Sequence, residues 1–242
     1  MANQIGQLLN WGYFLDPRLI FPILGGLLPP LVWLYFWLKE DAHPEPPKRL
    51  VYTFLAGMLS VFFALWAEEM IYYAEVGTGI IKTLTGSIIL LALWAIIEES
   101  IKFVAAYFGG IKRAECDEPI DEPIYMITAA LGFAAMENIL FLVNTIKKTQ
   151  GLEFLPAMLT GDLRFIGANI LHVATSAIVG ITLAMCFFHT HSKVRNIIGG
   201  LFVASSLHFF FNYLIIKEWG ELNIMQITKV MLPLWLITVV KL

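Results

Sequence analysis

Long apolar runs constrain the fold of this chain more than any other feature. A helix needs about 20 mostly apolar residues to cross a bilayer, and seven segments approach that length. They lie at residues 19–38, 51–74, 86–111, 124–146, 164–188, 196–217 and 224–240. Hydrophobic residues make up 58% of the chain and charged residues 14%, too few charges to cover the surface of a soluble protein. We therefore predict an all-α polytopic membrane protein with about seven transmembrane helices in one domain spanning residues 1–242.

The first apolar segment and the two cysteines lead to further predictions. The first apolar segment contains Pro22, Pro29 and Pro30, so we expect a kink or break there. No cationic signal region precedes that segment, so we expect it to remain as a membrane anchor. The two cysteines, Cys116 and Cys186, lie far apart without a CxxC spacing, which favours free thiols over a disulfide.

Basic residues in the loops give an orientation. One set of alternate loops and ends carries Lys39, Lys48, Arg49, Lys112, Arg113, Lys193, Arg195 and Lys241, and the other carries Arg18, Lys82, Lys147, Lys148, Arg164, Lys217 and Lys229. The first set clusters tightly against helix ends, so we assign it to the cytoplasm, with the N-terminus outside and the C-terminus inside. The net charge of −3 gives no reason to expect a nucleic-acid partner. The partner implied by composition is the lipid bilayer.

Polar residues within the apolar segments point to the functional centre. A charged side chain at the middle of a membrane helix costs about 2.5–3.5 kcal/mol on insertion scales, so such groups should face one another or a water-filled cavity. Four successive segments carry them. The set is Glu98, Glu99 and Lys102, then Glu137 and Asn138, then Asn169, His172 and Ser176, then His208 and Asn212.

The depths of four of these groups agree. From the predicted outer ends of their helices, Glu98 lies about 18 Å in, Glu137 about 14 Å, His172 about 12 Å and His208 about 14 Å, at about 1.5 Å per residue. All four fall near the middle of a hydrocarbon core about 30 Å thick. We therefore expect them to meet in a central polar cavity.

The chemistry of this set suits hydrolysis. Lys102 is spaced i,i+4 from Glu98 and i,i+3 from Glu99, so it can neutralise either carboxylate. A buried carboxylate beside histidines can act as general base on water or help to bind a divalent metal that activates it. Asn212 could donate to a developing oxyanion. The residues alone do not decide whether the site binds zinc, another divalent metal or no metal.

The ordered motifs resemble a known family. They read Glu98-Glu99-x-x-Lys102, Gly132-Phe133-x-x-x-Glu137-Asn138, His172-x-x-x-Ser176 and His208-x-x-x-Asn212. This set resembles the PrsW family of intramembrane proteases, which belongs with the type II CAAX prenyl endopeptidases and their bacterial relatives. The resemblance implies an intramembrane peptidase of a bacterial inner or plasma membrane. It also implies a single-pass membrane protein, such as an anti-sigma factor, as substrate.

The resemblance assigns roles residue by residue. Glu98 looks like the glutamate that activates water, with Glu99 beside it. His208 and Asn212 look like an HxxxN pair, and His172 looks like the additional family histidine. Glu137 stands where CAAX endopeptidases carry the histidine of an FxxxH motif, a departure shared with PrsW-type members. The supporting residues are Lys102, Asn138 and Ser176, and the metal ligands, if one is bound, are Glu98, Glu137, His172 and His208.

Other functions remain open at this point. The same cluster could be the relay of a proton- or cation-coupled transporter, although no inverted repeat accompanies it. A catalytically silent relative that binds membrane proteins, and a purely structural knot of buried charges, are further alternatives. Two nearby features receive no catalytic role. We assign Glu68 and Glu69 to the membrane interface, and we expect the acidic loop 117–122 to be solvated.

Overall fold

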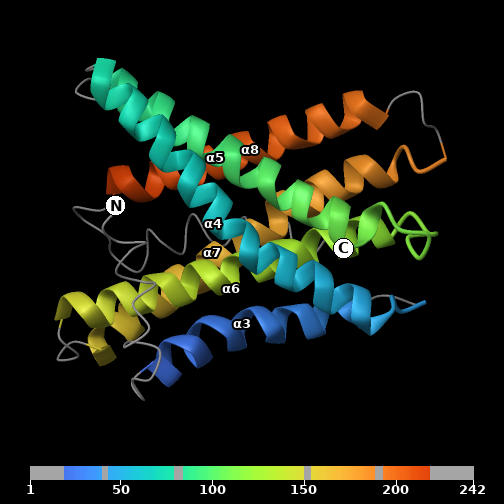
Figure 1. Cartoon of the computed structure of the whole chain (residues 1–242), viewed down its shortest axis with the longest axis horizontal. Helices are drawn as coiled ribbons and strands as arrows, with labels where there is room; N and C mark the ends of the chain where they lie inside the picture. Colours follow the sequence, from blue (N-terminus) through green and yellow to red (C-terminus); the bar gives the residue numbers. More distant parts are fainter. Residues whose placement is uncertain (1–18, 40–42, 79–83, 150–153, 189–192, 219–242) are drawn as a thin grey trace.

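The computed structural model describes residues 19–39, 43–78, 84–149, 154–188 and 193–218, and these residues form a bundle of long helices (Figure 1). Their bounds are α3 (Ile20–Leu38), α4 (Pro47–Thr78), α5 (Leu84–Ala106), α6 (Asp121–Thr149), α7 (Phe154–Ala184) and α8 (Lys193–Glu218), with a π-helical turn η3 (Tyr107–Ile111) directly after α5.

The all-helical membrane fold is confirmed. Five helices of the described residues are long and apolar enough to cross a membrane, within Ile20–Leu38, Pro47–Ala74, Asp121–Thr145, Gly167–Ala184 and Lys193–Leu214. Helix α5 is not among these five. It has 23 residues and carries Glu98, Glu99 and Lys102, the three charged residues predicted to lie in the site. The predicted helix at residues 224–240 lies outside the described residues.

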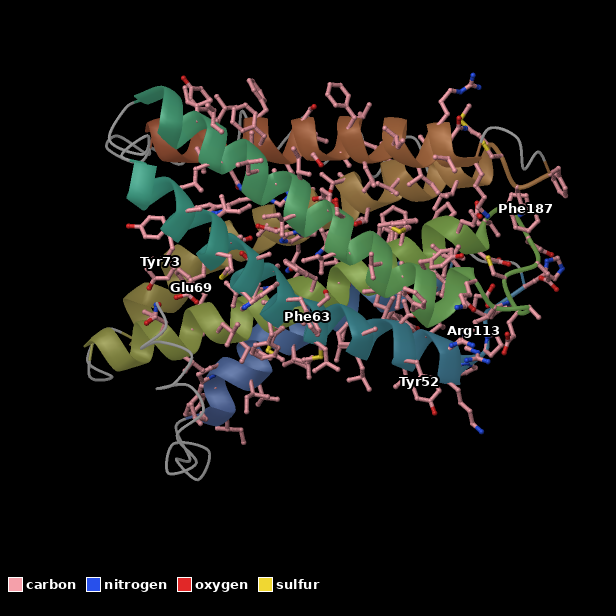
Figure 2. All side chains as sticks on the ribbon, turned by 45° about the horizontal axis from the view of Figure 1, so that its top comes forward. Tyr52, Phe63, Glu69, Tyr73, Arg113 and Phe187 are labelled. Atoms are coloured by element: carbon pink, nitrogen blue, oxygen red, sulfur yellow. The ribbon has the colours of Figure 1, made fainter. Side chains whose placement is uncertain are left out.

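Helix α6 is the centre of the bundle. Every residue from Asp121 to Ala135 is buried, because α3, α4 and α7 pack around this part of the helix. Helix α8 packs against both α5 and α7 and closes the remaining side. Large apolar side chains on the outer faces are exposed, such as Phe63 and Tyr52 on α4, and Tyr52 points away from the bundle (Figure 2). The fold therefore surrounds one helix and leaves apolar surface for lipid.

Two glycines let α4 and α6 touch backbone to backbone. A methyl group added at Gly57 would lie 2.8 Å from the carbonyl carbon of Ala129, and one added at Gly132 would lie 2.9 Å from that of Phe54. Small residues permit such close approach of membrane helices, where packing and not the hydrophobic effect drives association. Gly132 belongs to the sequence motif that contains Glu137, so this contact also fixes the position of that carboxylate.

The first helix does not break at its prolines, and a kink there stays a prediction. Helix α3 continues through Pro29 and Pro30. Pro30 is buried, and close packing against α6 holds the helix along its length. At Gly26 the approach is closest, since an added methyl group would lie 2.7 Å from the backbone nitrogen of Ile139.

The predicted third helix changes its winding near its end. After Ala106 the chain forms the wider turn η3, in which Lys112 N donates to Tyr107 O over 3.0 Å. Gly109 and Gly110 allow this turn to lie against neighbours, because methyl groups there would meet the Thr53 backbone and the Tyr125 ring. Isolated π-turns of this kind often accompany functional sites.

The acidic loop is more ordered than its composition suggested. Asp121 is buried, and its Oδ2 accepts hydrogen bonds from the backbone N–H groups of Asp117 (2.9 Å) and Glu118 (2.7 Å). Tyr125 donates to the buried Glu45. The expectation of a solvated loop was therefore wrong for its buried carboxylates.

Both cysteines are free, as predicted. Burial, together with the nearby carboxylates of Asp121 and Glu122, raises the pKa of the Cys116 thiol to about 12. Cys116 therefore carries little thiolate at neutral pH and should be a poor nucleophile.

The glycine contact between α4 and α6 generates a prediction. Gly132→Ala should destabilise the protein by about 1–3 kcal/mol, because the added methyl group overpacks a backbone contact. Gly199→Ala is the matched control, since nothing lies within 4 Å of an added methyl group there. Thermal unfolding in detergent measures both. Equal melting temperatures for the two variants would contradict the role of the contact.

Candidate active site

The most deeply buried part of the site is an ion pair. On α5, Lys102 Nζ donates to Glu99 Oε1 over 2.6 Å, and both side chains are completely buried. The i,i+3 spacing brings them to one face of the helix. Neither charge could stay in an apolar interior alone, so each makes the burial of the other tolerable.

His208 joins this pair from α8. Its Nδ1 lies 2.7 Å from Glu99 Oε1 and its Nε2 lies 3.7 Å from Glu98 Oε2. A carboxylate can only accept, so Nδ1 carries the proton in this contact. The other ring nitrogen, Nε2, is thereby turned towards Glu98. This is the arrangement in which an outer carboxylate fixes the tautomer of a functional histidine.

His172 connects the pair to α6. Its Nδ1 lies 3.0 Å from Lys102 Nζ, and its Nε2 lies 2.9 Å from Glu137 Oε2. A charged lysine can only donate, so Nδ1 accepts and the proton of a neutral His172 sits on Nε2, where it donates to Glu137. The two imidazole rings stand edge to face, 5.5 Å apart between centroids.

Exposure increases from one side of this cluster to the other. The side chains of Glu99 and Lys102 are 0% exposed, those of Glu98 and Glu137 15% and 44%. Glu98 Oε2 is buried without a hydrogen-bond partner among the described residues. One side of the cluster, at Glu99 and Lys102, is therefore fully buried with paired charges, and the other side, at Glu137, is accessible. The carboxylate between them, Glu98, has an oxygen left to accept a proton.

The other predicted residues lie around this cluster. Asn138 donates to Asn169 over 3.3 Å, which ties α6 to α7. Ser176 Oγ is buried one turn beyond His172, with no hydrogen-bond partner in the described part of the chain. Asn212 lies half-buried one turn beyond His208, and the structure does not bring it into the hydrogen-bond network of the histidines.

Glu68 of α4 is a charged residue near the cluster that the sequence interpretation did not place there. It lies close enough to Glu98 and Glu137 for their charges to interact. It follows the buried Ala64 by one turn, on the face of α4 that packs against Phe133. That helical spacing was the available signal. Its neighbour Glu69 is labelled in Figure 2, beside Tyr73 on the same helix.

The donor set fits a divalent metal. Glu98, His172 and His208 offer ligand atoms that all lie within 4.8 Å of one another. His208 Nε2 is unprotonated in the tautomer described above, whereas His172 would have to give up its contact with Lys102 or with Glu137 to bind a metal. Two imidazoles and one carboxylate are a familiar set for catalytic zinc, which keeps a further position open for water or substrate. The hydrogen bond from His208 to Glu99 supplies the outer carboxylate that such ligands usually have.

Known proteins match this chain over most of its length. A family model described as PrsW family intramembrane metalloprotease matches residues 45–240. The chain is 27% identical over 202 residues to a protein named Protease PrsW from Geobacillus kaustophilus, covering 82% of both chains. It is 26% identical to the Bacillus subtilis protein of that name, covering 81% of this chain and 84% of the relative. For the Clostridioides difficile protein, the identity is 25% and the coverage 92% and 87%. No solved structure gives a significant match.

The buried ion pair generates a prediction on stability. Lys102→Met should cost about 3–5 kcal/mol, because it leaves Glu99 charged in an apolar interior. The double variant Glu99→Gln with Lys102→Met should recover much of that loss. Arg49→Gln is the control, since it breaks a partly exposed pair with Glu115, and exposed ion pairs stabilise a protein little. Equal unfolding free energies for Lys102→Met and Arg49→Gln would contradict the account.

Proposed function

Because the chain belongs to the PrsW family of intramembrane metalloproteases, we propose that it hydrolyses a peptide bond of a single-pass membrane protein at the Glu98–His172–His208 cluster. The chain is an intramembrane protease by family, with a membrane-protein substrate and a lipid environment. Its relatives are bacterial, and it is a multi-pass membrane protein. The bacterial inner or plasma membrane is the location we propose.

One observation carries the proposal. Glu98 presents an oxygen without a hydrogen-bond partner among the described residues, and that oxygen faces His208 Nε2 at 3.7 Å. Glu99 and Lys102 balance each other beneath it. A proton acceptor placed next to a histidine at the edge of a dry site suits general base catalysis on water.

In the mechanism we propose, Glu98 takes a proton from water as the water oxygen bonds to the substrate carbonyl carbon. The carbonyl oxygen becomes an oxyanion, which N–H donors at the site would stabilise. The carbon–nitrogen bond then breaks, and the proton held by Glu98 passes to the leaving amine. Glu98 ends as it began, so the cycle is balanced with one water consumed.

The surrounding residues would hold the reacting groups in place. Glu99 fixes the tautomer of His208, and Lys102 fixes that of His172. Asn212, on the turn after His208, is our candidate donor to the oxyanion once substrate is bound. Glu137, at the accessible edge, supplies a second carboxylate beside His172.

A divalent metal, which we propose to be zinc, would be held by Glu98, His172 and His208. When bound, it supplies Lewis acid chemistry, polarising a carbonyl and lowering the pKa of water. Glu137 is close enough to His172 to extend this donor set or to share the proton-accepting role with Glu98. The family assignment favours this peptidase chemistry over the transporter alternative.

The test is cleavage of a panel of single-pass membrane proteins by the purified chain in detergent. Glu98→Gln and His208→Ala should each lose at least about 100-fold in rate, since acid–base catalysis contributes about 10²–10⁴-fold. Asp117→Asn, in an exposed loop, should retain the wild-type rate. Full cleavage by folded Glu98→Gln would refute the assignment of Glu98.

A further inference from the structure

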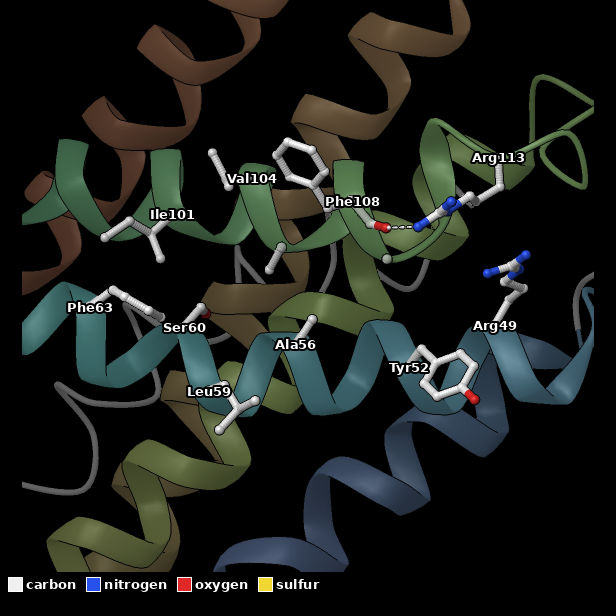
Figure 3. A pocket seen from close by; sticks show the side chains of 12 residues that line it. Arg49, Tyr52, Ala56, Leu59, Ser60, Phe63, Ile101, Val104, Phe108 and Arg113 are labelled. Carbon is white, nitrogen blue, oxygen red and sulfur yellow. Dashed lines mark hydrogen bonds between the residues drawn. The ribbon is translucent and has the colours of Figure 1, made fainter.

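A long apolar groove runs along the outside of the bundle between α4 and α5, apart from the polar site. Its volume is about 760 Å³, within the about 300–1,000 Å³ usual for ligand pockets. One wall is a helical stripe of α4 that includes Tyr52, Leu59 and Phe63, and the other includes Val104 and Phe108 (Figure 3). All five side chains are exposed, so the groove opens outward to the membrane.

The groove has one charged end. Arg49 and Arg113 lie there, opposite the end formed by Phe63 and Ile101 (Figure 3). Arg113 is exposed, and its guanidinium group donates one long hydrogen bond, of 3.5 Å, to Phe108 O.

The charged end is net positive. Lys112 Nζ lies 4.8 Å from the centroid of the Phe108 ring, which adds a third cation to this end. Glu115 neutralises Arg49, with Oε1 at 2.8 Å from Nη2. Two of the three cations thus remain available to an anion.

The walls of the groove offer an occupant no comparable polar contact. The lining has two hydroxyl groups: that of Ser60 donates to the carbonyl of Gly57 over 2.7 Å within its own helix, and that of Tyr52 lies towards the charged end, near Arg49 (Figure 3). A matching ligand therefore has an anionic group at one end and a long apolar remainder. A phospholipid with a net negative headgroup has this chemistry, and basic pockets between membrane helices bind such lipids.

The length of the groove matches that of one lipid. From Arg49 to Phe63 the groove follows α4 for about 21 Å, close to the about 20–22 Å of one leaflet with its headgroups.

From this match we propose that the groove binds one anionic phospholipid. Its phosphate contacts Arg113 and Lys112, and an acyl chain lies between α4 and α5 from Tyr52 to Phe63. Binding at this site does not depend on the proposed peptidase activity.

The test uses the full chain reconstituted into vesicles of phosphatidylglycerol and phosphatidylcholine in equal amounts. Native mass spectrometry then measures which lipid stays bound after detergent extraction. Wild type should retain phosphatidylglycerol in preference to phosphatidylcholine. Arg113→Gln should reduce that retention about fivefold, since one basic residue near a membrane surface is worth about 1 kcal/mol towards an anionic lipid.

Two further variants separate this site from general surface charge. Ala56→Phe fills the groove and should reduce retention of both lipids, whereas Arg195→Gln removes an exposed arginine of α8 outside the groove and should leave it unchanged. Equal losses in Arg113→Gln and Arg195→Gln, or no preference in wild type, would overturn the proposal. So would displacement of the lipid by a single-pass substrate peptide, which would assign the groove to substrate.

Discussion

The ion pair between Glu99 and Lys102 is the interaction on which the rest of the site depends. Both side chains are completely buried in α5, inside the apolar bundle, where either charge alone would cost several kcal/mol. Their pairing does more than cancel charge. Glu99 also accepts from His208 of α8, and Lys102 contacts His172 of α7, so one pair on α5 orients a histidine on each of two other helices.

Packing and electrostatics cooperate at this centre. The backbone contact between α4 and α6 through Gly57 and Gly132 brings Glu68 and Glu137 towards the carboxylates of α5. A cluster of four carboxylates would repel itself, and the lysine and two histidines offset that repulsion. A divalent cation would offset it further. The same arrangement thus explains why the cluster suits both membrane insertion and the hydrolysis of a peptide bond.

Sequence reasoning located the helices and the polar cluster because both depend on local patterns. The apolar runs require helices, and the shared depth of Glu98, Glu137, His172 and His208 follows from the rise per residue. Helix α7 begins at Phe154, ten residues before the predicted position, because Asp162 and Arg164 interrupt the apolar run without interrupting the helix.

Three-dimensional relations were not accessible in this way. Spacing allowed Lys102 to pair with either glutamate. The pairing with Glu99 depends on contacts with two other helices, through His208 of α8 and His172 of α7. The proximity of Glu68 to Glu98 and Glu137 could not be predicted, because those residues lie on other helices. The buried hydrogen bond of Asp121 depends on how the loop folds back on itself, which composition cannot indicate.

The central claim is that this network presents Glu98, His172 and His208 as one metal-capable hydrolytic centre. X-ray absorption spectroscopy on the purified protein, with its metal content measured in parallel, tests that claim most directly. The account predicts about one divalent metal per chain, with two imidazoles and a carboxylate as ligands, and its loss in His208→Ala but not in Asp117→Asn. Full proteolytic activity in protein stripped of metal, or ligands other than these residues, would contradict it.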